Sequence, residues 1–351
     1  MINVPITKND GGQRLDRFMR KYLRNASLSM IYRMIRKDVK VNGKRAHIET
    51  ELKEGDVLSI YISQEELKAL TGGRKKTAPV KKQFNIVFED DNILVADKPF
   101  GLLTHGDSRE KRRTLVNQVK GYLESSGTYD EEKEKVFRIA SANRLDRNTT
   151  GLVVFGKTSA AMKALSSAFS DKDRIEKYYL TIVSGELEKE LRLSGRLEKD
   201  EKRNMTRVLS DEQERGKSAE TIVKPLACRN GYAFVMVRLM TGRTHQIRAH
   251  LAQAGYPLIG DAKYGDKKTN EIIKKKLGIT TQLLHACRLV FREMEEPLGC
   301  LEGRSFEAEL PQMMEKALEK LLGISRKEAE DMFHGAACGE RDDLIKKTER
   351  N

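Results

Sequence analysis

The hydrophobic pattern of the first sixty residues predicts two helices followed by short strands. One helix face carries apolar side chains at the i, i+3, i+4 spacing, and these are Leu15, Phe18, Met19, Tyr22 and Leu23. A second helix is predicted after Ser27 or Ser29, either of which can cap it, with an apolar face of Ile31, Met34 and Ile35. Asn42-Gly43 then predicts a tight turn, and residues 57–62 predict a closing strand.

The middle of the chain has mainly strand-like patterns separated by single helices. Residues 63–83 contain glycines, prolines and lysines with little apolar periodicity, and they predict an extended basic linker. Strands are expected at 86–88, 93–96, 152–155, 177–183 and 231–239, and helices at 114–123 and 159–169. The acidic residues 125–135 are predicted to form an exposed loop.

Two further helical regions are expected near the end of the chain. Thr244 is a candidate N-cap for a helix whose inner face carries Ile247 and Leu251. Apolar residues between Met314 and Leu322 predict another helix, and a second short helix is expected after it, with a frayed end beyond residue 334.

Composition narrows the class of protein. The 351 residues suit two domains or one large one, and 66 Lys and Arg against 52 Asp and Glu give a net charge of +14. This charge favours a nucleic acid or an anionic membrane surface as partner, although an ordinary basic protein would share it. No run of about 18 apolar residues or apolar signal core is present, so we expect no membrane span. The four cysteines form no Cys-x-x-Cys pair, which indicates a reducing cytoplasm and no zinc ribbon.

Candidate chemistry begins at Asp146, which stands between Arg144 and Arg147 just before the apolar strand. Neighbouring cations favour an ionised carboxylate, and a carboxylate on a tight loop can serve as nucleophile or base. A simple turn with solvated arginines would give the same tetrapeptide, and a second copy at 14–17 lies on the first predicted helix. Gly151 allows the backbone to bend or approach another segment closely.

Two later segments can complete a site around this aspartate. Tyr178 and Tyr179 alternate along a strand, so one can stack on a base while the other packs in the core. Arg243 and Arg248 flank the start of the helix after Thr244 and cannot both be solvated if that helix end lines a cleft. The spacing of His245 and His250 does not suit a helical zinc site, so we expect no metal.

These motifs together resemble the RluA-type pseudouridine synthases. The resemblance rests on Arg144-Leu145-Asp146, Lys177 to Leu180, Gly242 to His250, Gly260-Asp261 and Leu284-His285-Ala286, in that order, and covers about residues 84–311. Asn143 and Thr150 depart from the usual His and Ser. The resemblance implies an α+β catalytic domain with a mixed, mainly antiparallel sheet, flanking helices and a central basic cleft. The apolar pattern described above predicts a helical tail after it, at 312–351.

The resemblance also implies a reaction without metal or cofactor, in which the uridine N1–C1′ bond breaks, the base rotates and C5 rejoins the sugar. Asp146 corresponds to the family's catalytic aspartate, which could attack the sugar, attack the base or remove a sugar proton. Tyr179 corresponds to a tyrosine that stacks on the target base, and Arg248, or Arg243, to the cation that keeps Asp146 ionised. The expected substrate contacts are Arg144, which fills the gap left by the flipped base, Arg147, Arg243 and His245.

The first 62 residues resemble the S4 RNA-binding domain. The resemblance is carried by the first helix start, the second helix ending at Lys37, the turn at Asn42-Gly43 and Gly55-Asp56. It implies phosphate contacts from the second helix and the basic turn, namely Arg33, Arg36, Lys37, Lys40, Lys44 and Arg45. A purely solvated charged face is the alternative.

We therefore expect a monomeric, cytoplasmic pseudouridine synthase that acts on RNA, with large-subunit rRNA as the favoured target. A non-catalytic RNA-binding or ribosome-assembly protein on the same scaffold is the alternative. The combination of Asp146, Tyr179 and Arg248 favours the enzyme.

Overall fold

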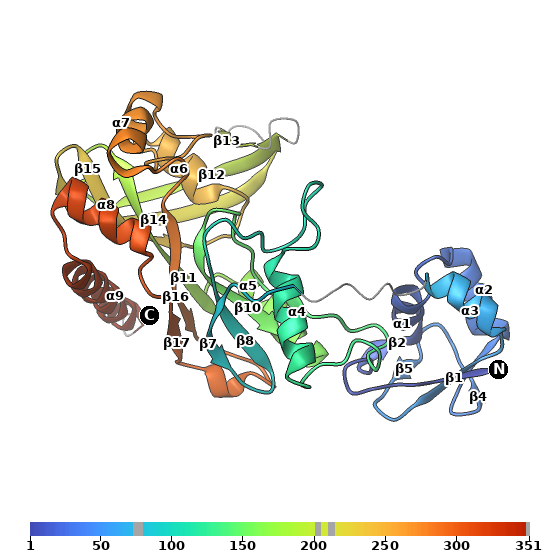
Figure 1. Cartoon of the computed structure of the whole chain (residues 1–351). Coiled ribbons are helices and arrows are strands. Elements are labelled where there is room, and N and C mark those ends of the chain that lie inside the picture. The colour runs from blue at the N-terminus through green and yellow to red at the C-terminus, as the bar shows by residue number, and fades with distance from the viewer. Residues whose placement is uncertain (73–79, 201–204, 210–214, 349–351) are drawn as a thin grey trace.

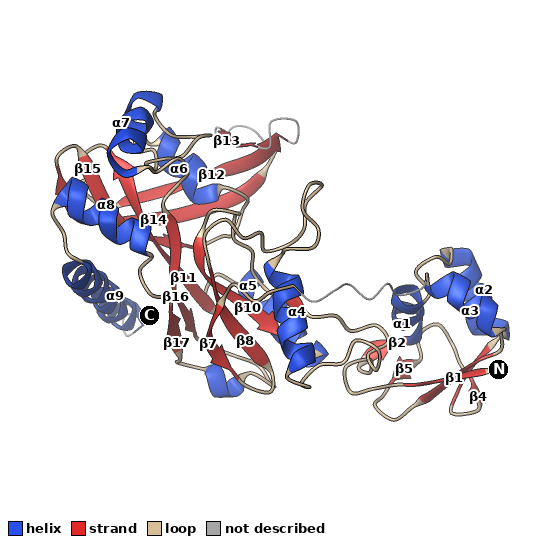
Figure 2. Cartoon of the chain, viewed as in Figure 1, coloured by secondary structure: helices blue, strands red, loops and turns tan. Residues whose placement is uncertain are grey.

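A mixed sheet of 11 strands forms the centre of the computed structural model, which describes residues 1–72, 80–200, 205–209 and 215–348 (Figures 1 and 2). Its main strand order is β13 (Met205–Leu209), β12 (Leu191–Asp200), β14 (Lys217–Arg229), β15 (Tyr232–Leu239), β11 (Ile175–Ser184), β16 (Leu284–Phe291), β10 (Thr150–Gly156), β8 (Ile93–Lys98) and β7 (Asn85–Glu89). β9 (Ala140–Ser141) and β17 (Ser305–Glu307) pair with β10 and β16. Neighbouring strands are antiparallel except for β10 and β16, which are parallel. The expected mixed, mainly antiparallel sheet is confirmed.

Helices flank this sheet and begin where the sequence supplies N-caps. α4 (Leu115–Ser125), α5 (Ser159–Ser170) and α7 (Lys267–Leu277) are capped by Thr114, Thr158 and Asp266, whose side chains accept backbone N–H bonds. α6 (Gln246–Gln253) follows β15, and a short 3₁₀ helix spans Gly299–Leu301.

The C-terminal helices are part of the sheet's packing and not an independent tail. α8 (Gln312–Leu322) lies against β14 and β15, and α9 (Arg326–Thr348) lies against α8 and β14. Met314 and Leu318 are buried with Phe234 of β15. α9 is helical from Arg326 to Thr348, so helix extends past residue 334, where the sequence predicted a frayed end.

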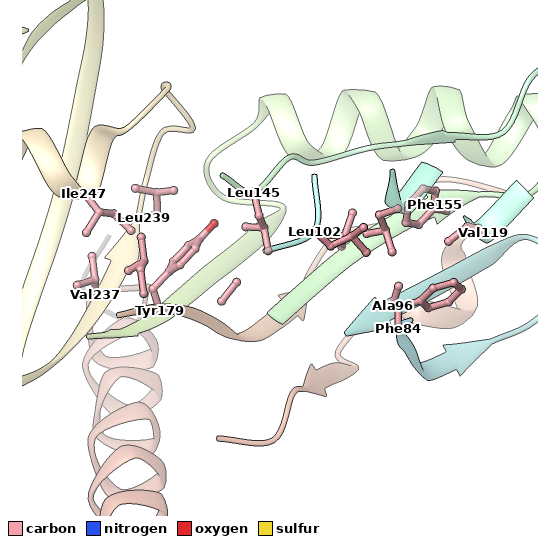
Figure 3. Close-up of a cluster of buried hydrophobic side chains, with 14 of the residues drawn as sticks. Phe84, Ala96, Leu102, Val119, Leu145, Phe155, Tyr179, Val237, Leu239 and Ile247 are labelled. Atoms are coloured by element: carbon pink, nitrogen blue, oxygen red, sulfur yellow. The ribbon is translucent and has the colours of Figure 1, made fainter. Parts of the chain in front are cut away.

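The two faces of β11 enter different cores. Tyr178 packs with Ile182 and the C-terminal helices, whereas Tyr179 packs with Leu239 and Ile247 on the opposite face (Figure 3). This is the alternation expected of consecutive strand residues. It places Tyr179 on the face where the candidate site lies.

The N-terminal segment folds around its own core. Its sheet has the order β1 (Ile2–Pro5), β6 (Val57–Ile60), β3 (Val39–Val41) and β4 (Lys44–Arg45), and β2 (Gln13–Arg14) pairs with β5 (Glu51–Leu52). α1 (Leu15–Tyr22) and α2 (Leu28–Lys37) bury the apolar faces predicted for them. Ser27 caps α2 by accepting the Met30 N–H. Asn42 and Gly43 both have positive φ, as a two-residue hairpin turn requires.

The prediction of an extended linker at residues 63–83 is wrong over its first part, which forms a helix. Ser63 caps α3 (Gln64–Thr71), and Leu70 of this helix is buried in the N-terminal core. The Leu70 carbonyl accepts the N–H of Asn25, which fixes the helix to the segment between α1 and α2. We call residues 1–72 the N-terminal module. Residues 73–79, including Arg74-Lys75-Lys76, lie outside the described residues.

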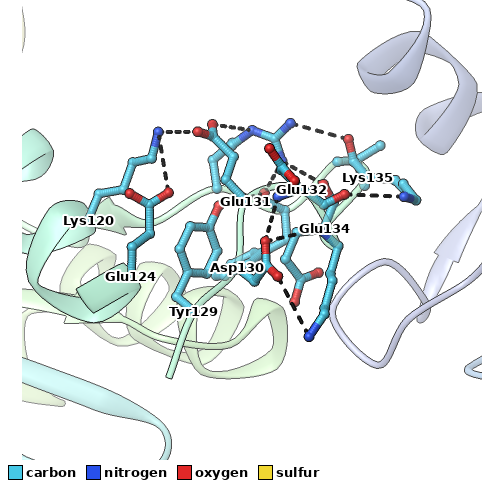
Figure 4. Close-up of polar contacts among 12 residues, drawn as sticks. Lys120, Glu124, Tyr129, Asp130, Glu131, Glu132, Glu134 and Lys135 are labelled. Carbon is cyan, nitrogen blue, oxygen red and sulfur yellow. Dashed lines mark hydrogen bonds and ion pairs between the residues drawn. The ribbon is translucent and has the colours of Figure 1, made fainter. Parts of the chain in front are cut away.

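The acidic loop after α4 contacts the N-terminal module instead of facing only solvent. The buried Asp10 carboxylate accepts backbone N–H bonds from Lys135, Val136 and Phe137 at 2.8, 2.8 and 3.2 Å. Val136 packs into the module's core. Ion pairs tie the same loop to α4, as Figure 4 shows for Lys120 and Glu131. We call residues 126–138 the docking loop.

Candidate active site

The loop between β9 and β10 carries Asp146. Side chains from elsewhere in the chain hold this loop in place by donating hydrogen bonds to its backbone carbonyl groups. The wholly buried Lys98 ammonium donates to the carbonyl of Arg147 at 3.0 Å and to that of Leu102 at 2.8 Å. Thr104 Oγ1 donates to the carbonyl of Leu145 at 3.0 Å. Burial, partly offset by the charges of Asp146 and Asp97, lowers the pKa of Lys98 to about 7. The backbone around Asp146 is therefore fixed from the protein interior.

Gly151 allows this loop to enter the sheet. Its φ is +106°, and a Cβ placed there would lie 2.2 Å from the carbonyl oxygen of Ala286 in β16. Any side chain would push β10 away from β16, so the close backbone approach expected from the sequence is confirmed. Leu152 to Phe155 then form the expected buried strand.

Asn143 and Thr150, the two residues that depart from the family motif, form hydrogen bonds that hold β10 in place. Asn143 donates from Nδ2 to the carbonyl of Leu152 at 3.0 Å and accepts the Val154 N–H at 2.9 Å. Thr150 Oγ1 lies 2.9 Å from Nδ1 of His285. Both residues therefore have structural partners within the described part of the chain, and neither displaces Asp146.

Arg248 binds Asp146 and a second carboxylate at the same time. Its Nη1 donates to Asp146 Oδ2 at 2.9 Å, while Nε and Nη2 donate to the two oxygens of Asp261 at 2.6 and 2.8 Å. Asp261 has no exposed surface and also accepts the N–H groups of Lys263 and Tyr264. This fork fixes the guanidinium, and the guanidinium fixes one oxygen of Asp146.

Charge pairing outweighs desolvation at both members of the buried pair. Burial opposes the charge of Arg248, but the hydrogen bonds and charges of Asp261 and Asp146 raise its pKa above the ordinary value. Burial likewise opposes ionisation of Asp261, but the bonds from Arg248 and the backbone hold its pKa below the ordinary value. The cation next to Asp146 is therefore permanently charged.

The cations that flank Asp146 in sequence do not pair with it. Arg144 and Arg147 are exposed, and the ion pair with Asp146 is made by Arg248 instead. Arg144 lies at the edge of the cavity described next, whereas Arg147 lies outside its lining. A side chain between two others in sequence need not face either, and here the ionic partner comes from 102 residues further along.

A cavity of about 350 Å³ opens beside Asp146. Apolar side chains form one wall, with Leu145, Leu239 and Ile247 lying around the ring of Tyr179 (Figure 3). Burial raises the pKa of Tyr179, so its phenol is neutral and protonated at neutral pH. The structure thus brings Asp146, Tyr179 and Arg248 to one cavity, which has the size and mixed lining of a small-ligand site.

His245 also lines the cavity, at the first turn of α6. It is the N-cap residue, with φ of +53°, so the expectation that Thr244 caps this helix is wrong. Its Nε2 lies 3.7 Å from Asp146 Oδ2, and its Nδ1 lies 3.0 Å from the hydroxyl of Tyr264. Burial is the main reason that its pKa is lowered to about 4.

The other predicted contact residues lie at the surface. Arg243 is exposed at the cavity edge and donates from Nε to the carbonyl of Ser218 at 3.1 Å. It does not share Arg248's contact with Asp146. In the N-terminal module the six basic positions are all exposed, and these are Arg33, Arg36, Lys37, Lys40, Lys44 and Arg45.

The sequence did not indicate roles for Asp261, Tyr264 and Lys98. Asp261 and Tyr264 stand in a recognisable motif, but nothing in one sequence tells which distant side chain they contact. Lys98 follows an apolar strand, and a buried lysine cannot be distinguished from a surface one by its position there. Among the described residues, no group of three or more His, Cys, Asp or Glu could hold a metal. No helix in the described ranges has the length and apolar character needed to cross a bilayer.

Comparison with known proteins agrees with this geometry. The model of the RNA pseudouridylate synthase family matches residues 92–253. Ribosomal large subunit pseudouridine synthase C of Escherichia coli (strain K12) is 32% identical over 327 residues, covering 91% of this chain and 96% of that protein. The enzyme of the same name from Vibrio vulnificus (strain CMCP6) is 31% identical over 324 residues, with the same two shares. The solved structure of Human RNA Pseudouridylate Synthase Domain Containing 4 has a TM-score of 0.52 and 21% identity, covering 67% of this chain and 92% of that one.

The fold and the carboxylate site thus define an RNA-modifying isomerase. The chain belongs to the RluA family of RNA pseudouridine synthases.

Proposed function

We propose that this enzyme isomerises uridines of large-subunit ribosomal RNA and that Asp146 initiates the reaction. The printed names of relatives at 31–32% identity over 91% of the chain support the choice of RNA. The observation that carries the role of Asp146 is its 2.9 Å bond to Arg248 at the edge of a cavity of about 350 Å³.

The carboxylate is held in a way that suits attack or proton removal. Arg248 binds Oδ2, and within the described part of the chain no hydrogen bond engages Oδ1. The side chain is 27% exposed, so the second oxygen is accessible from the cavity. A partly dry wall strengthens the attraction between Arg248 and this carboxylate.

Other cavity residues would receive the extruded uridine. Extrusion from a folded RNA costs a few kcal/mol, which base stacking can offset. The ring of Tyr179 offers that stacking surface, and its neutral hydroxyl can donate a hydrogen bond. Arg144, exposed at the cavity edge, is placed to occupy the vacated position in the RNA.

We further infer that the N-terminal module is an S4-like RNA-binding unit, separate from a catalytic unit that begins near residue 84. Its exposed arginines and lysines on α2 and on the β3–β4 hairpin suit phosphate contacts. We propose a monomer as the acting form. We also propose a cytoplasmic location, because the relatives compared above are bacterial enzymes named for ribosomal RNA.

The test compares the wild type with Asp146→Asn on unmodified ribosomal RNA and counts pseudouridines chemically. Asn keeps the shape but cannot act as nucleophile or base, so pseudouridine formation should be abolished while melting temperature and RNA affinity change little. Asp16→Asn in the other Arg-Leu-Asp-Arg segment is the matched control and should retain full activity. An active Asp146→Asn would exclude Asp146 from the chemistry, and an inactive wild type on all RNAs would favour the binding-protein alternative.

A further inference from the structure

Three residues beside Asp146 form a short hydrogen-bonded relay. The hydroxyl oxygen of Tyr264 lies 2.6 Å from the backbone nitrogen of Thr206 in β13 and 3.0 Å from Nδ1 of His245. A backbone N–H can only donate, so the Tyr264 oxygen accepts from Thr206. The phenol oxygen could accept a second bond from Nδ1 of His245 or donate its own proton to it. An unprotonated Nε2 would turn its lone pair toward the Asp146 carboxylate, 3.7 Å away, and this repulsion favours the phenol as the donor to Nδ1.

This relay favours one of the two neutral tautomers of His245. An Nδ1 that accepts from Tyr264 is unprotonated, so the neutral ring of His245 carries its proton on Nε2. Nε2 is the nitrogen that lies 3.7 Å from Asp146 Oδ2. The lowered pKa of His245, caused mainly by burial, keeps the ring neutral at physiological pH.

We propose that His245, held in its Nε2–H tautomer by Tyr264 and β13, is a positioning residue that donates a hydrogen bond to Oδ2 of Asp146 when uridine is bound. The inference rests on the proposed role of Asp146. Hydrogen bonds of this kind are often long in ligand-free enzymes and shorten when substrate binds. Arg248 and His245 would then both hold Oδ2, and Oδ1 alone would face the uridine.

A neutral donor suits this place better than a second cation. Arg248 already supplies a permanent positive charge to Asp146 and shares it with Asp261. A protonated histidine would stabilise the carboxylate further and make it a weaker nucleophile or base. A neutral N–H donor fixes the direction of the carboxylate and adds no positive charge. The φ of +53° at His245 fits this view, because such strain in a residue other than glycine is characteristic of functional sites.

Two substitutions at residue 245 separate the hydrogen bond from the backbone shape. Asn tolerates positive φ, but its amide is too short to reach the place of Nε2. Gln carries an N–H donor close to that place. His245→Asn should lower kcat about ten- to a hundredfold, the range for losing one hydrogen bond to a charged group, with KM changed less than about twofold. His245→Gln should recover most of the loss.

Tyr264→Phe tests the relay itself. Phe keeps the ring, whose centroid lies 5.0 Å from the Arg248 guanidinium, and removes the hydroxyl that selects the tautomer. The variant should lower kcat to a similar degree without changing KM. Tyr122→Phe is the matched control, because it removes a comparable hydroxyl bond, to Glu89 at 2.9 Å, away from the cavity. It should keep wild-type kcat.

Nitrogen-15 NMR of the imidazole gives a readout independent of activity and of RNA. We expect Nε2 protonated and Nδ1 unprotonated in the wild type, and a mixture of tautomers in Tyr264→Phe. A wild type protonated on Nδ1, or an Asn variant with wild-type kcat, would overturn the proposal. Failure of the proposed function is detected by a different experiment, because it would appear as pseudouridine formation by Asp146→Asn. The NMR measurement of the His245 tautomer does not depend on that result. If His245→Asn does not fold, Tyr264→Phe and the spectrum decide the question.

Discussion

Arg248 and Asp261 form a buried two-point ion pair whose geometry determines where the third guanidinium nitrogen can reach. With Nε and Nη2 bound to Asp261 at 2.6 and 2.8 Å, the guanidinium plane is fixed, and Nη1 donates to Asp146 at 2.9 Å. Asp261 therefore acts on the catalytic carboxylate through Arg248, although it does not line the cavity. Asp261 thus orients the Asp146 carboxylate by fixing the Arg248 guanidinium.

Asp261→Asn should reduce both stability and activity. The substitution leaves Arg248 with a neutral partner in a buried site, and breaking such a pair typically costs about 3–5 kcal/mol of stability. kcat should fall at least about tenfold because the guanidinium can turn away from Asp146. Chemical denaturation and pseudouridine counting measure the two effects. Glu295→Gln, which breaks the exposed ion pair with Arg174, is the control and should change neither stability nor kcat. Wild-type stability and kcat in Asp261→Asn would contradict the proposal that Asp261 orients Arg248.

Replacing Arg36 and Lys37 with Ala should weaken RNA binding and flatten its salt dependence. Each lost phosphate contact lowers the slope of log affinity against log salt by roughly one unit, so the double variant should lose about two. Fluorescence anisotropy at several salt concentrations measures this slope. Lys316 and Lys320, both exposed on α8, provide a control with the same charge change. Equal slopes for the two double variants would mean that α2 has only a solvated charged face.

Asp10→Asn should loosen the N-terminal module from the catalytic unit. The buried carboxylate accepts three N–H bonds from the docking loop, and an amide would turn an N–H group toward N–H donors. We expect faster proteolytic cleavage within residues 126–138 and a thermal transition that separates into two. Asp16→Asn, in an exposed pair with Arg14, should behave as wild type. A protease pattern identical to wild type would show that Asp10 does not maintain the docking.

Asp97→Asn should stabilise the protein more at pH 7 than at pH 4. Burial, with a contribution from Glu309, raises the pKa of Asp97 to about 6 from its ordinary 3.8. The folded state therefore binds more protons than the unfolded state between these values, and the cost of the buried charge appears as pH rises through this window. Asn has no such cost. Denaturation of both proteins at the two pH values checks the sign, and a pH-independent difference would refute it.

How far the sequence predicts the site depends on the separation of the interacting residues. Asp146 and Tyr179 could be proposed because they stand in motifs of a few neighbouring residues. Strand alternation showed only that Tyr178 and Tyr179 face opposite ways, and the family resemblance selected Tyr179. The partner of Arg248 at residue 261 could not, because it depends on how α6 and the loop after it pack together. The helix α3 was missed because only Leu67 and Leu70 mark its inner face, although Ser63 and Glu66 have the spacing of a helix capping box.

The parallel pairing of β10 with β16 has a consequence for when the enzyme becomes active during its own synthesis. Thr150 and His285 are 135 positions apart, so the Asp146 loop leaves the ribosome long before the strand beside which it must settle. Contacts of such separation form late, after the intervening chain has ordered. A nascent chain ending before residue 284 therefore carries the aspartate without its neighbouring strand. We therefore expect no catalysis from such a shortened chain.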